Sequence, residues 1–458
     1  MSSLPSPSSF ACFTLAAAVA AHSLAGCASV AGTATQRGAR ESASAGVLVA
    51  WNRAILEAAE QEDRFLTLKG LHTAALFHLA AHDTLNAIHR RYRTYLPLEV
   101  EGEGGPAAEE VDPVAAVAQA AHSVVTRQYP ERREAFDAEL ARWLESVPAG
   151  AARERGVEVG ATAAERILAA RQGDGWDNRA EYRWHPMAPG VYAEFPEHSG
   201  TPEGFVFGAG WATARPFVLD APGQFRVPPP PAIDSAEYAR AFAEVEELGR
   251  YRSASRTADQ THLAMWWKEF VESSHNRLAR ELVTEEDLDL WDAARLFALL
   301  EAAIFDGYVD VFENKFHYNH WRPYTAIRWA DHDGNPRTDA DPDWTNTHRH
   351  TYAFPSYPSA HGTACAAAMT VLASVFGGER AFTMTTPEVD AAGPLSEKVR
   401  MVPPTRGFPS FSAAARECAL SRVYLGIHFR YDSEAGNELG ARIGRYVLDH
   451  ALRRVDGE

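Results

Sequence analysis

The sequence predicts a mainly α-helical protein made of helical bundles, two packed four-helix-type bundles with long ordered loops. Apolar residues recur at helical spacing through most of the chain, and no alternation of the kind found in strands persists. With 458 residues, of which 46% are apolar, the chain can bury one large core or two modest ones. We expect an N-terminal helical half over residues 46–232 and a C-terminal half over 233–458.

Residues 1–27 indicate a lipoprotein-type signal segment. The run from Phe10 to Ala25 is apolar but too short to cross a bilayer as a stable helix, and it leads into Leu24-Ala25-Gly26-Cys27, which resembles a bacterial lipobox. We therefore expect an exported lipoprotein, periplasmic or at the cell surface, with its lipid anchor on Cys27. No Lys or Arg precedes Arg37, so a plain secretory peptide and an unexported apolar tail are the alternatives.

A flexible tether rich in Ala, Gly, Ser and Thr is expected over 28–45, and helices follow it. In the N-terminal half, apolar periodicity predicts helices over 47–60, 66–89, 114–128, 135–144 and 151–172. Residues 173–232 are rich in Gly, Pro and aromatic residues and end in Pro228–Pro231, which indicates an ordered connector. In the C-terminal half, we expect helices over 235–248, 258–283 and 285–314, and long loops over 331–358 and 377–409.

The net charge of the chain is −17, and the acidic excess is spread along the sequence. Such a charge argues against nucleic acid or an anionic membrane surface as a partner, because like charges repel. The membrane contact that we expect is through the N-terminal lipid anchor alone. A cationic pocket inside this acidic chain would therefore be a local device rather than a consequence of bulk charge.

Lys315 and the pair Arg322-Pro323 form the first of three motifs suited to an oxyanion. Lys315 lies near the end of a predicted helix, and Pro323 disfavours the α conformation at Arg322, so the chain should leave the helix there. The two cations could then converge on one point, the guanidinium as a planar fork and the ammonium as a compact charge. Taken alone, this pattern also fits a solvated helix end.

The second motif is Ser359-Ala360-His361, which opens a predicted helix of small residues. Ser359 suits the N-cap or the first turn of that helix. The free amides of the first turn, together with the helix dipole, attract an anion, and His361 would face the same anion. Taken alone, an ordinary capped helix with an exposed histidine fits equally well.

The third motif consists of Arg422, His428 and Asp432. Arg422 ends a predicted helix that Gly426 breaks, and Asp432 or Ser433 is expected to cap the last helix. Asp432 is close enough to accept the ring N–H of His428, which would leave the other ring nitrogen free as a ligand or nucleophile. Taken alone, a capping Asp beside an unrelated His is the competing interpretation.

Together the three motifs supply three cations, a hydroxyl, a helix N-terminus and two histidines, an inventory for phosphate or vanadate. From Lys315 to Asp432 they resemble the signature of the superfamily that joins vanadium-dependent haloperoxidases, bacterial non-specific acid phosphatases and type 2 phosphatidic acid phosphatases. Ala360 stands where that family more often has glycine, but alanine donates the same backbone N–H. The body of the chain has no membrane-spanning run, which excludes the phosphatidic acid phosphatase branch.

The resemblance extends beyond the motifs, to most of residues 46–455. Bacterial proteins of the vanadium haloperoxidase type are similar at Trp51-Asn52-Arg53, at residues 80–92, at Arg256-Thr257 with Gln260, and at the Pro228–Pro231 connector. These outer similarities are looser than the motifs. They favour the haloperoxidase branch of the superfamily over the phosphatase branches.

The resemblance implies a role for each motif residue. Five residues would neutralise or hydrogen-bond the equatorial oxygens of bound vanadate: Lys315, Arg322, Ser359, Ala360 and Arg422. His428 would bond the vanadium, and Asp432 would orient His428. His361 would act as the acid–base group at the opposite, apical oxygen.

Three functions remain open at this point. The first is a vanadate-dependent haloperoxidase that oxidises halide with hydrogen peroxide to hypohalous acid, which reacts with a small organic acceptor. The second is a secreted acid phosphatase without a cofactor, in which His428 would attack the phosphorus of a phosphate ester and His361 would protonate the leaving alcohol. The third is a non-catalytic protein that binds an oxyanion.

Phe354 is the candidate residue for a halide pocket. It lies seven residues before His361, where an aromatic residue resembles the chloroperoxidases of the family. Phe312, however, lies three residues before Lys315, where those enzymes have Trp, so the halide preference stays open. The neighbouring loop residues Trp344, His348 and His350 either line the entrance or lie in solvent.

Cys365 and Cys418 each lie four residues from a motif residue, His361 and Arg422 respectively. Each thiol is thus about one helical turn from the expected site. In an oxidising compartment the two could form a disulfide between the site helices, and two buried thiols are the alternative. No Cys or His spacing in the sequence indicates zinc.

Overall fold

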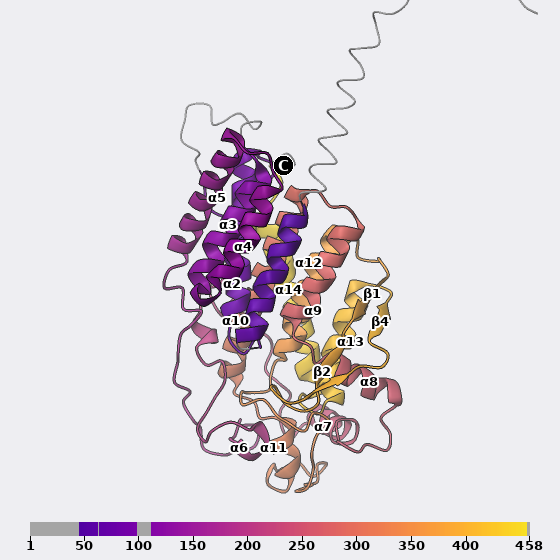
Figure 1. Ribbon diagram of the computed structural model, residues 1–458. Coiled ribbons are helices and arrows are strands. Elements are labelled where there is room, and N and C mark those ends of the chain that lie inside the picture. Colours follow the sequence, from indigo (N-terminus) through magenta and orange to yellow (C-terminus); the bar gives the residue numbers. More distant parts are fainter. Residues whose placement is uncertain (1–44, 63, 99–110, 456–458) are drawn as a thin grey trace, which may run out of the picture.

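The computed structural model describes residues 45–62, 64–98 and 111–455. The expected signal segment over 1–27 and the tether over 28–45, apart from Ala45, lie outside these residues. Within them the protein is mainly α-helical with little sheet, as predicted (Figure 1). Among the described helices, none combines the length and the apolar character that a membrane span requires.

The N-terminal bundle contains the helix of residues 45–62 and four more helices, drawn in indigo to magenta in Figure 1. They are α2 (Lys69–Ile88), α3 (Pro113–Gln128), α4 (Arg133–Glu145) and α5 (Ala151–Ala170), with the 3-10 turn η2 (Pro130–Arg132) before α4. The sequence sets the start of α3 clearly, because the carboxylate of Asp112 accepts the amides of Val114 and Ala115, each at 3.0 Å. Helix α3 then packs against α2, α4 and α5.

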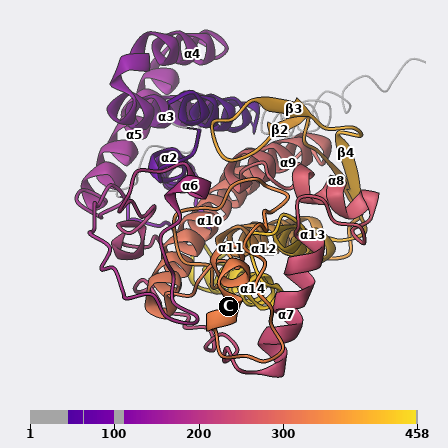
Figure 2. The ribbon, with the colours of Figure 1, turned by 90° about the horizontal axis from the view of Figure 1, so that it is seen from below.

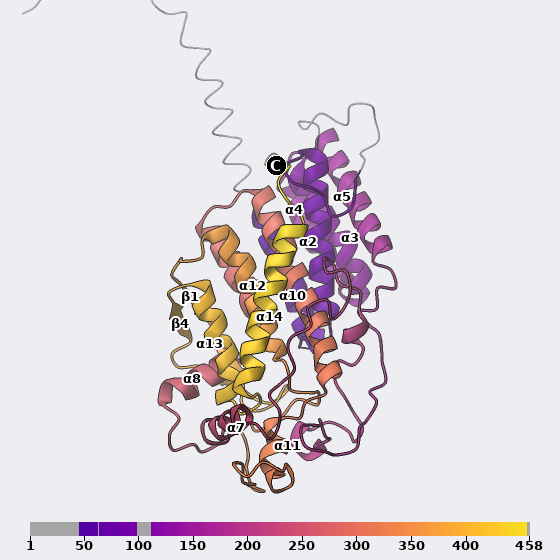
Figure 3. The ribbon, with the colours of Figure 1, turned by 180° about the vertical axis from the view of Figure 1, so that it is seen from behind.

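The C-terminal bundle contains α9 (Val271–Glu285), α10 (Leu290–Tyr318), α12 (Ala360–Phe376), α13 (Phe411–Tyr424) and α14 (Arg430–His450). Helix α10 packs against α12 and α14 of this bundle and also against α2 of the other, so it lies between the two (Figures 1 and 3). Most of its side chains are buried all round the helix. A helix that is buried on every face is expected in such a central position.

The bounds of α10 differ from the predicted 285–314. Asp289 caps the helix by accepting the amides of Trp291 and Asp292, at 2.9 and 3.0 Å, so the helix begins later. At the other end Asn319 adopts a left-handed conformation, with φ of 48°, and stops the helix after Tyr318. Lys315 therefore lies inside the last turn of α10.

The connector between the bundles is held on α10 through its backbone. The carboxylate of Asp306 accepts the amides of Phe217, Val218 and Leu219 at 2.6–2.9 Å. Asp310 and Asn314, one and two turns further along the same helix face, accept backbone amides of residues 225 and 227. Short elements α6 (Pro196–Ser199) and η3 (Trp211–Thr213) interrupt this otherwise irregular segment.

Short helices lie at one end of the C-terminal bundle, and short strands lie beside α9 and α13 (Figure 1). The helices are α7 (Ala236–Leu248), α8 (Ala258–Trp266), α11 (Pro323–Arg328) and η4 (Ala330–His332). The predicted loop over 377–409 contains four strands, β1 (Phe382–Thr385), β2 (Glu388–Asp390), β3 (Lys398–Arg400) and β4 (Thr405–Phe408). Strands β1 and β4 pair antiparallel, as do β2 and β3. Strands of three or four residues are too short to show a period in the sequence, so the prediction of a plain loop was wrong.

The single helix expected over 258–283 is also wrong, because the structure divides it into α8 and α9. The chain leaves the helix after Trp266 and resumes it at Val271, with extended backbone at Phe270. Both Trp266 and Trp267 are buried, so apolar spacing continues across the break and hides it. The break exposes the carbonyl of Trp267, which matters for the site described below.

Helices α12 and α14 approach each other unusually closely. Gly436, Gly440 and Gly444 repeat at intervals of four residues on α14 and face the backbone of α12. A Cβ at Gly436 would lie 2.4 Å from the carbonyl oxygen of Ser359, and one at Gly440 would lie 2.0 Å from that of Thr363. The glycines therefore fix the distance between α14 and the N-terminus of α12.

Candidate active site

The three sequence motifs meet at one end of the C-terminal bundle. There α10 and α13 end, and α12 and α14 begin, so residues far apart in the sequence become neighbours. Figure 2 views the molecule from this end and shows α11 in front of α12 and α14. The short helices and the long loops therefore shield the ends of the four helices from solvent.

His428 is held by groups on two sides of its ring. Its Nδ1 lies 2.9 Å from Oδ2 of Asp432 and 3.2 Å from the hydroxyl of Ser356, and Asp432 also accepts the hydroxyl of Ser356. An N–H on Nδ1 donates to the carboxylate, which leaves a lone pair on Nε2. The guanidinium NH1 of Arg322 lies 3.2 Å from that Nε2. The predicted contact between Asp432 and His428 is present.

Asp432 does not cap α14 in the predicted way. The N-cap is Phe429, and Asp432 is the third residue of the helix, where its carboxylate accepts the amide of Phe429 at 3.1 Å. Ser433 is likewise inside the helix. The same carboxylate thus fixes both the helix start and the histidine ring.

The three cations of the motifs are all buried. Lys315 and Arg322 are 0% exposed and Arg422 is 2% exposed. The ammonium of Lys315 donates to the carbonyls of Pro355 and Ser356, at 3.0 and 2.7 Å. Arg322 donates from Nε to the carbonyl of Phe354 at 2.8 Å, while its NH2 has no partner among the described residues. Carbonyl dipoles thus position the cations without cancelling their charge.

The carbonyl of Trp267 joins two of the motif residues. Arg422 donates to it from NH2 at 2.5 Å, and the same carbonyl acts on the His361 ring, whose pKa it raises against the lowering by burial. The remaining nitrogen of His361, Nε2, is buried and has no partner in the described part of the chain. His361 therefore presents one ring nitrogen that is free to exchange a proton.

The N-terminus of α12 adds donors to the cluster. Ser359 is the N-cap, and its hydroxyl accepts the amide of Gly362 at 3.3 Å. The carbonyl of Asp432 accepts the amide of Ser359 at 2.9 Å, which brings α12 and α14 together at this point. Ala360 begins the helix without a positive φ, so alanine can donate its amide as glycine would.

Burial and mutual repulsion shape the electrostatics of the site. Burial lowers the pKa of Lys315, and the nearby Arg322 lowers it further, while burial alone lowers the pKa of Arg322 to about 10. Burial and the three cations lower the pKa of His428, which keeps the imidazole neutral. Burial raises the pKa of Asp432, against the opposing effects of Ser356 and Lys315. An anion would relieve the repulsion between these cations.

Phe354 lies within this cluster. Its ring carries the guanidinium of Arg322 at 4.5 Å and the ammonium of Lys315 at 5.2 Å from its centroid. The rings of Phe312 and Tyr352 lie 5.2 and 5.6 Å away. The candidate halide residue is thus a wall of the cationic cluster.

Sequence reasoning missed Ser356, Trp267 and Tyr352. Ser356 carries no signal of its own, because it precedes the motif serine in a loop rich in proline and aromatic residues. Trp267 acts through a backbone carbonyl, which no side-chain pattern can reveal. Tyr352 is half-buried and acts electrostatically on both Arg322 and Arg422.

The structure also decides between the alternatives for the loop residues near the site and for the two cysteines. Trp344 and His348 are buried and His350 is half-buried, so this loop does not lie in solvent. Cys365 and Cys418 are free, buried thiols, which is the second of the two interpretations. Nε2 of His275 lies 3.2 Å from the sulfur of Cys365.

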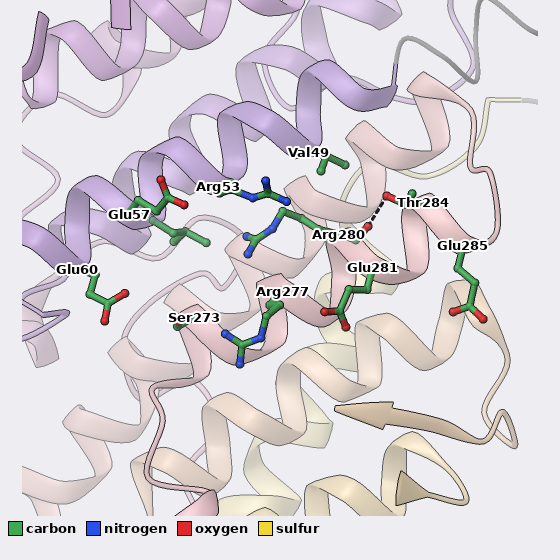
Figure 4. Close-up of a pocket in the computed structure, with 11 residues that line it drawn as sticks. Val49, Arg53, Glu57, Glu60, Ser273, Arg277, Arg280, Glu281, Thr284 and Glu285 are labelled. Atoms are coloured by element: carbon green, nitrogen blue, oxygen red, sulfur yellow. Dashed lines mark hydrogen bonds between the residues drawn. The ribbon is translucent and has the colours of Figure 1, made fainter. Parts of the chain in front are cut away.

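A cavity of about 730 Å³ lies elsewhere, between the helix of residues 45–62 and α9 (Figure 4). None of the motif residues lines it. Arg280 in its wall donates from NH1 to the side chain of Asn52 at 2.6 Å. The Trp51-Asn52-Arg53 segment therefore belongs to the contact between the two bundles and not to the oxyanion cluster.

Comparison with known proteins places these observations in a family context. Residues 295–457 match the family model described as the VCPO second helical-bundle domain. The vanadium chloroperoxidase of Curvularia inaequalis is 26% identical over an alignment of 266 positions, and the match covers 45% of this chain and 42% of the relative. The matched region thus spans less than half of the length of this curated relative.

Solved structures extend the likeness to nearly the whole fold. A bacterial vanadium-dependent iodoperoxidase superimposes with a TM-score of 0.68 at 22% identity, covering 91% of this chain and 98% of that one. A holo-type bacterial vanadium-dependent chloroperoxidase gives 0.61 at 18% identity, covering 83% and 91%. The resemblance to vanadium-dependent haloperoxidases that the three motifs indicate is therefore confirmed, in the sequence of the C-terminal bundle and in the fold of most of the chain.

Proposed function

We propose that this protein is a vanadate-dependent haloperoxidase that oxidises halide with hydrogen peroxide. The observation that carries the proposal is the buried cluster of Lys315, Arg322 and Arg422 around a neutral His428. Asp432 is the acid that raises the pKa of both Lys315 and Arg322, and so stabilises their charges. Burying three basic side chains with so little compensation is costly, and an anion in their site would offset that cost.

The residues present fit vanadate. The orphaned NH2 of Arg322 and the amide of Ala360 would donate to bound vanadate, and Lys315, Arg422 and the Ser359 hydroxyl would complete the set. Nε2 of His428 has the lone pair for a bond to vanadium, once the Arg322 guanidinium turns to the oxyanion. Bound vanadate would supply a Lewis acid that polarises hydrogen peroxide.

The protein's own residues manage protons and charge. Nε2 of His361 is buried without a partner among the described residues, so it would take and return a proton for the bound group. Asp432 keeps the proton of His428 on Nδ1, so that Nε2 stays available. Burial of the cluster strengthens each of these interactions by excluding water.

The burial of the site residues favours small reactants such as peroxide and halide over a phosphate ester. Lys315, Arg322, Ser359 and His428 are at most 4% exposed, which leaves little room for the alcohol part of a monoester. The looser similarities outside the motifs point the same way. An acid phosphatase, with His428 as nucleophile, is the outcome of the test below that would replace the proposal.

The test is bromination by purified protein loaded with orthovanadate. We expect it to brominate a dimedone-type acceptor when given peroxide and bromide, and His428→Ala to abolish this activity. His317→Ala, which changes an exposed histidine of α10, is the matched control and should retain it. Turnover of a phosphate ester by the vanadate-free protein, without halogenation, would instead establish a phosphatase.

The location of the protein is a separate proposal. We propose that it is exported and lipid-anchored at Cys27, on the strength of the lipobox-like sequence alone. Replacing Cys27 by Ser should move the protein from the membrane fraction to the soluble exported fraction. Equal membrane association of both proteins would contradict the anchor.

A further inference from the structure

His348 is a buried imidazole that no part of the described protein satisfies. Its side chain belongs to a residue only 1% exposed, and neither ring nitrogen has a hydrogen-bond partner among the described residues. A buried N–H without an acceptor has lost its hydrogen bond to water and gained none in return. Such a group marks a place where a small ligand gains by binding.

The backbone fixes His348 beside the oxyanion cluster. Its amide donates to the carbonyl of Leu425 at 3.2 Å, three residues after Arg422. Arg422 in turn donates to the carbonyl of Trp267, and Lys268 is the next residue. His348 therefore lies where the end of α13 meets the break between α8 and α9.

Basic side chains, and no acid, act on His348. Burial lowers its pKa, and the groups that lower it further are Lys268, His350, Arg422 and His198. No acid is among them. For Arg422 the groups acting against burial are thiols and phenols, such as Cys418 and Tyr352, rather than carboxylates. An unpartnered neutral N–H near Arg422 and Lys268 is a setting for an anion, although Asp390 partly offsets the charge of Lys268.

Ring contacts link His348 to the oxyanion cluster, and Lys268 lines a separate cavity. The ring of Tyr352 lies 5.4 Å from that of His348 and 5.6 Å from that of Phe354, which carries Arg322. Lys268, on the other side, is half-buried and lines a cavity of about 200 Å³ against the β2 strand. Its ammonium bonds the carbonyl of Ala392 at 2.5 Å.

We propose that His348, Arg422 and Lys268 bind the halide ion, beside the vanadate position and separate from it. This inference rests on the proposed function for its role in catalysis. We assign a halide to this position because one ring N–H and two cations suit a monatomic anion. The donors for a tetrahedral oxyanion converge instead at His428. Arg422 lies between the two positions, so it serves both anions, and Tyr352 and Phe354 form the apolar side of the halide position.

Steady-state kinetics with His348→Phe tests the role in catalysis. Phenylalanine keeps the ring contact with Tyr352 but removes both nitrogens. We expect the KM for bromide to rise about tenfold or more, which corresponds to the loss of one hydrogen bond to a charged partner, with the KM for peroxide unchanged. Lys268→Met should also raise the KM for bromide, and His317→Ala should not. A variant that lowers kcat alone, or raises both KM values together, would overturn the proposal.

A second measurement does not depend on activity. Crystals of the vanadate-free protein soaked in bromide should show an anomalous peak within hydrogen-bond distance of a His348 ring nitrogen, and the peak should vanish in His348→Phe. A peak only against Lys315 and Arg322, or no peak at all, would overturn the halide position. If the peak is present but vanadate neither binds nor supports bromination, the proposed function fails while the anion site stands.

Discussion

At the scale of single residues, His428 depends on the carboxylate that accepts its Nδ1–H. We predict that Asp432→Asn lowers the affinity for vanadate about 10- to 100-fold, the usual loss when a ligand histidine is deprived of its partner. The amide can turn its NH2 toward the ring and favour the wrong tautomer, with the lone pair on Nδ1. Calorimetric titration with orthovanadate measures the affinity. Asp449→Asn, at an exposed position near the end of α14, is the control, and equal affinities of the two variants would contradict the role of Asp432.

Glu301 on α10 is a second residue whose protonation state is set by its surroundings. It is 0% exposed, and neither carboxylate oxygen has a hydrogen-bond partner in the described part of the chain. Burial raises the pKa of Glu301 to about 8. The folded state therefore binds a proton that the unfolded state releases between about pH 4.5 and 8, so this group destabilises the fold progressively as pH rises through that window.

Glu301→Gln should remove this dependence on pH. We predict that the variant is about as stable as the wild type near pH 4 and more stable above pH 8, by up to about 5 kcal/mol in the free energy of unfolding. Urea denaturation across this pH range measures the difference. Glu158→Gln, an exposed position on α5, should show no such trend. A constant difference between variant and wild type at all pH values would refute the assignment.

At the scale of elements, the glycines of α14 hold the N-terminus of α12 in place. A methyl group at Gly436 would lie 2.4 Å from the carbonyl of Ser359, so the two helices must separate. We predict that Gly436→Ala costs about 1–3 kcal/mol of stability and weakens vanadate binding through the displaced Ser359 and Ala360. Gly378→Ala, where an added Cβ meets nothing within 4 Å, is the matched control for denaturation and vanadate titration. Unchanged vanadate affinity in Gly436→Ala would show that the contact is structural only.

Elements with strong sequence signals were predictable, and those made by tertiary contacts were not. Arg322 leaves the helical conformation and Ser359 caps α12 because Pro323 and the serine hydroxyl act locally. The break between α8 and α9 could not be predicted, because the side chain of Trp267 is buried and continues the apolar pattern across it. Only its carbonyl, which accepts from Arg422, reveals the break. Ser356 was missed because its partner His428 lies 72 residues away.

At the scale of the whole molecule, α10 makes the two bundles one cooperative unit. It packs against α2 on one side and against α12 and α14 on the other, so neither core is complete without it. We predict a single calorimetric unfolding transition for the protein, whose calorimetric and van't Hoff enthalpies agree. Two resolved transitions would show that the bundles unfold independently. The same reasoning predicts that residues 295–457 alone, which begin inside α10, do not form a stable fold.

The break at Trp267 has a consequence for engineering this protein. Elsewhere in a helical protein, a substitution that extends a helix is a dependable route to thermal stability. Here a continuous helix from α8 into α9 would turn the carbonyl of Trp267 into an internal helical bond and take it from both Arg422 and His361. Arg422, which would bind the anion, and His361, which would transfer the proton, would then both lose this carbonyl. The break between α8 and α9 is thus what lets one carbonyl serve both α12 and α13, and selection for thermal stability alone would remove it.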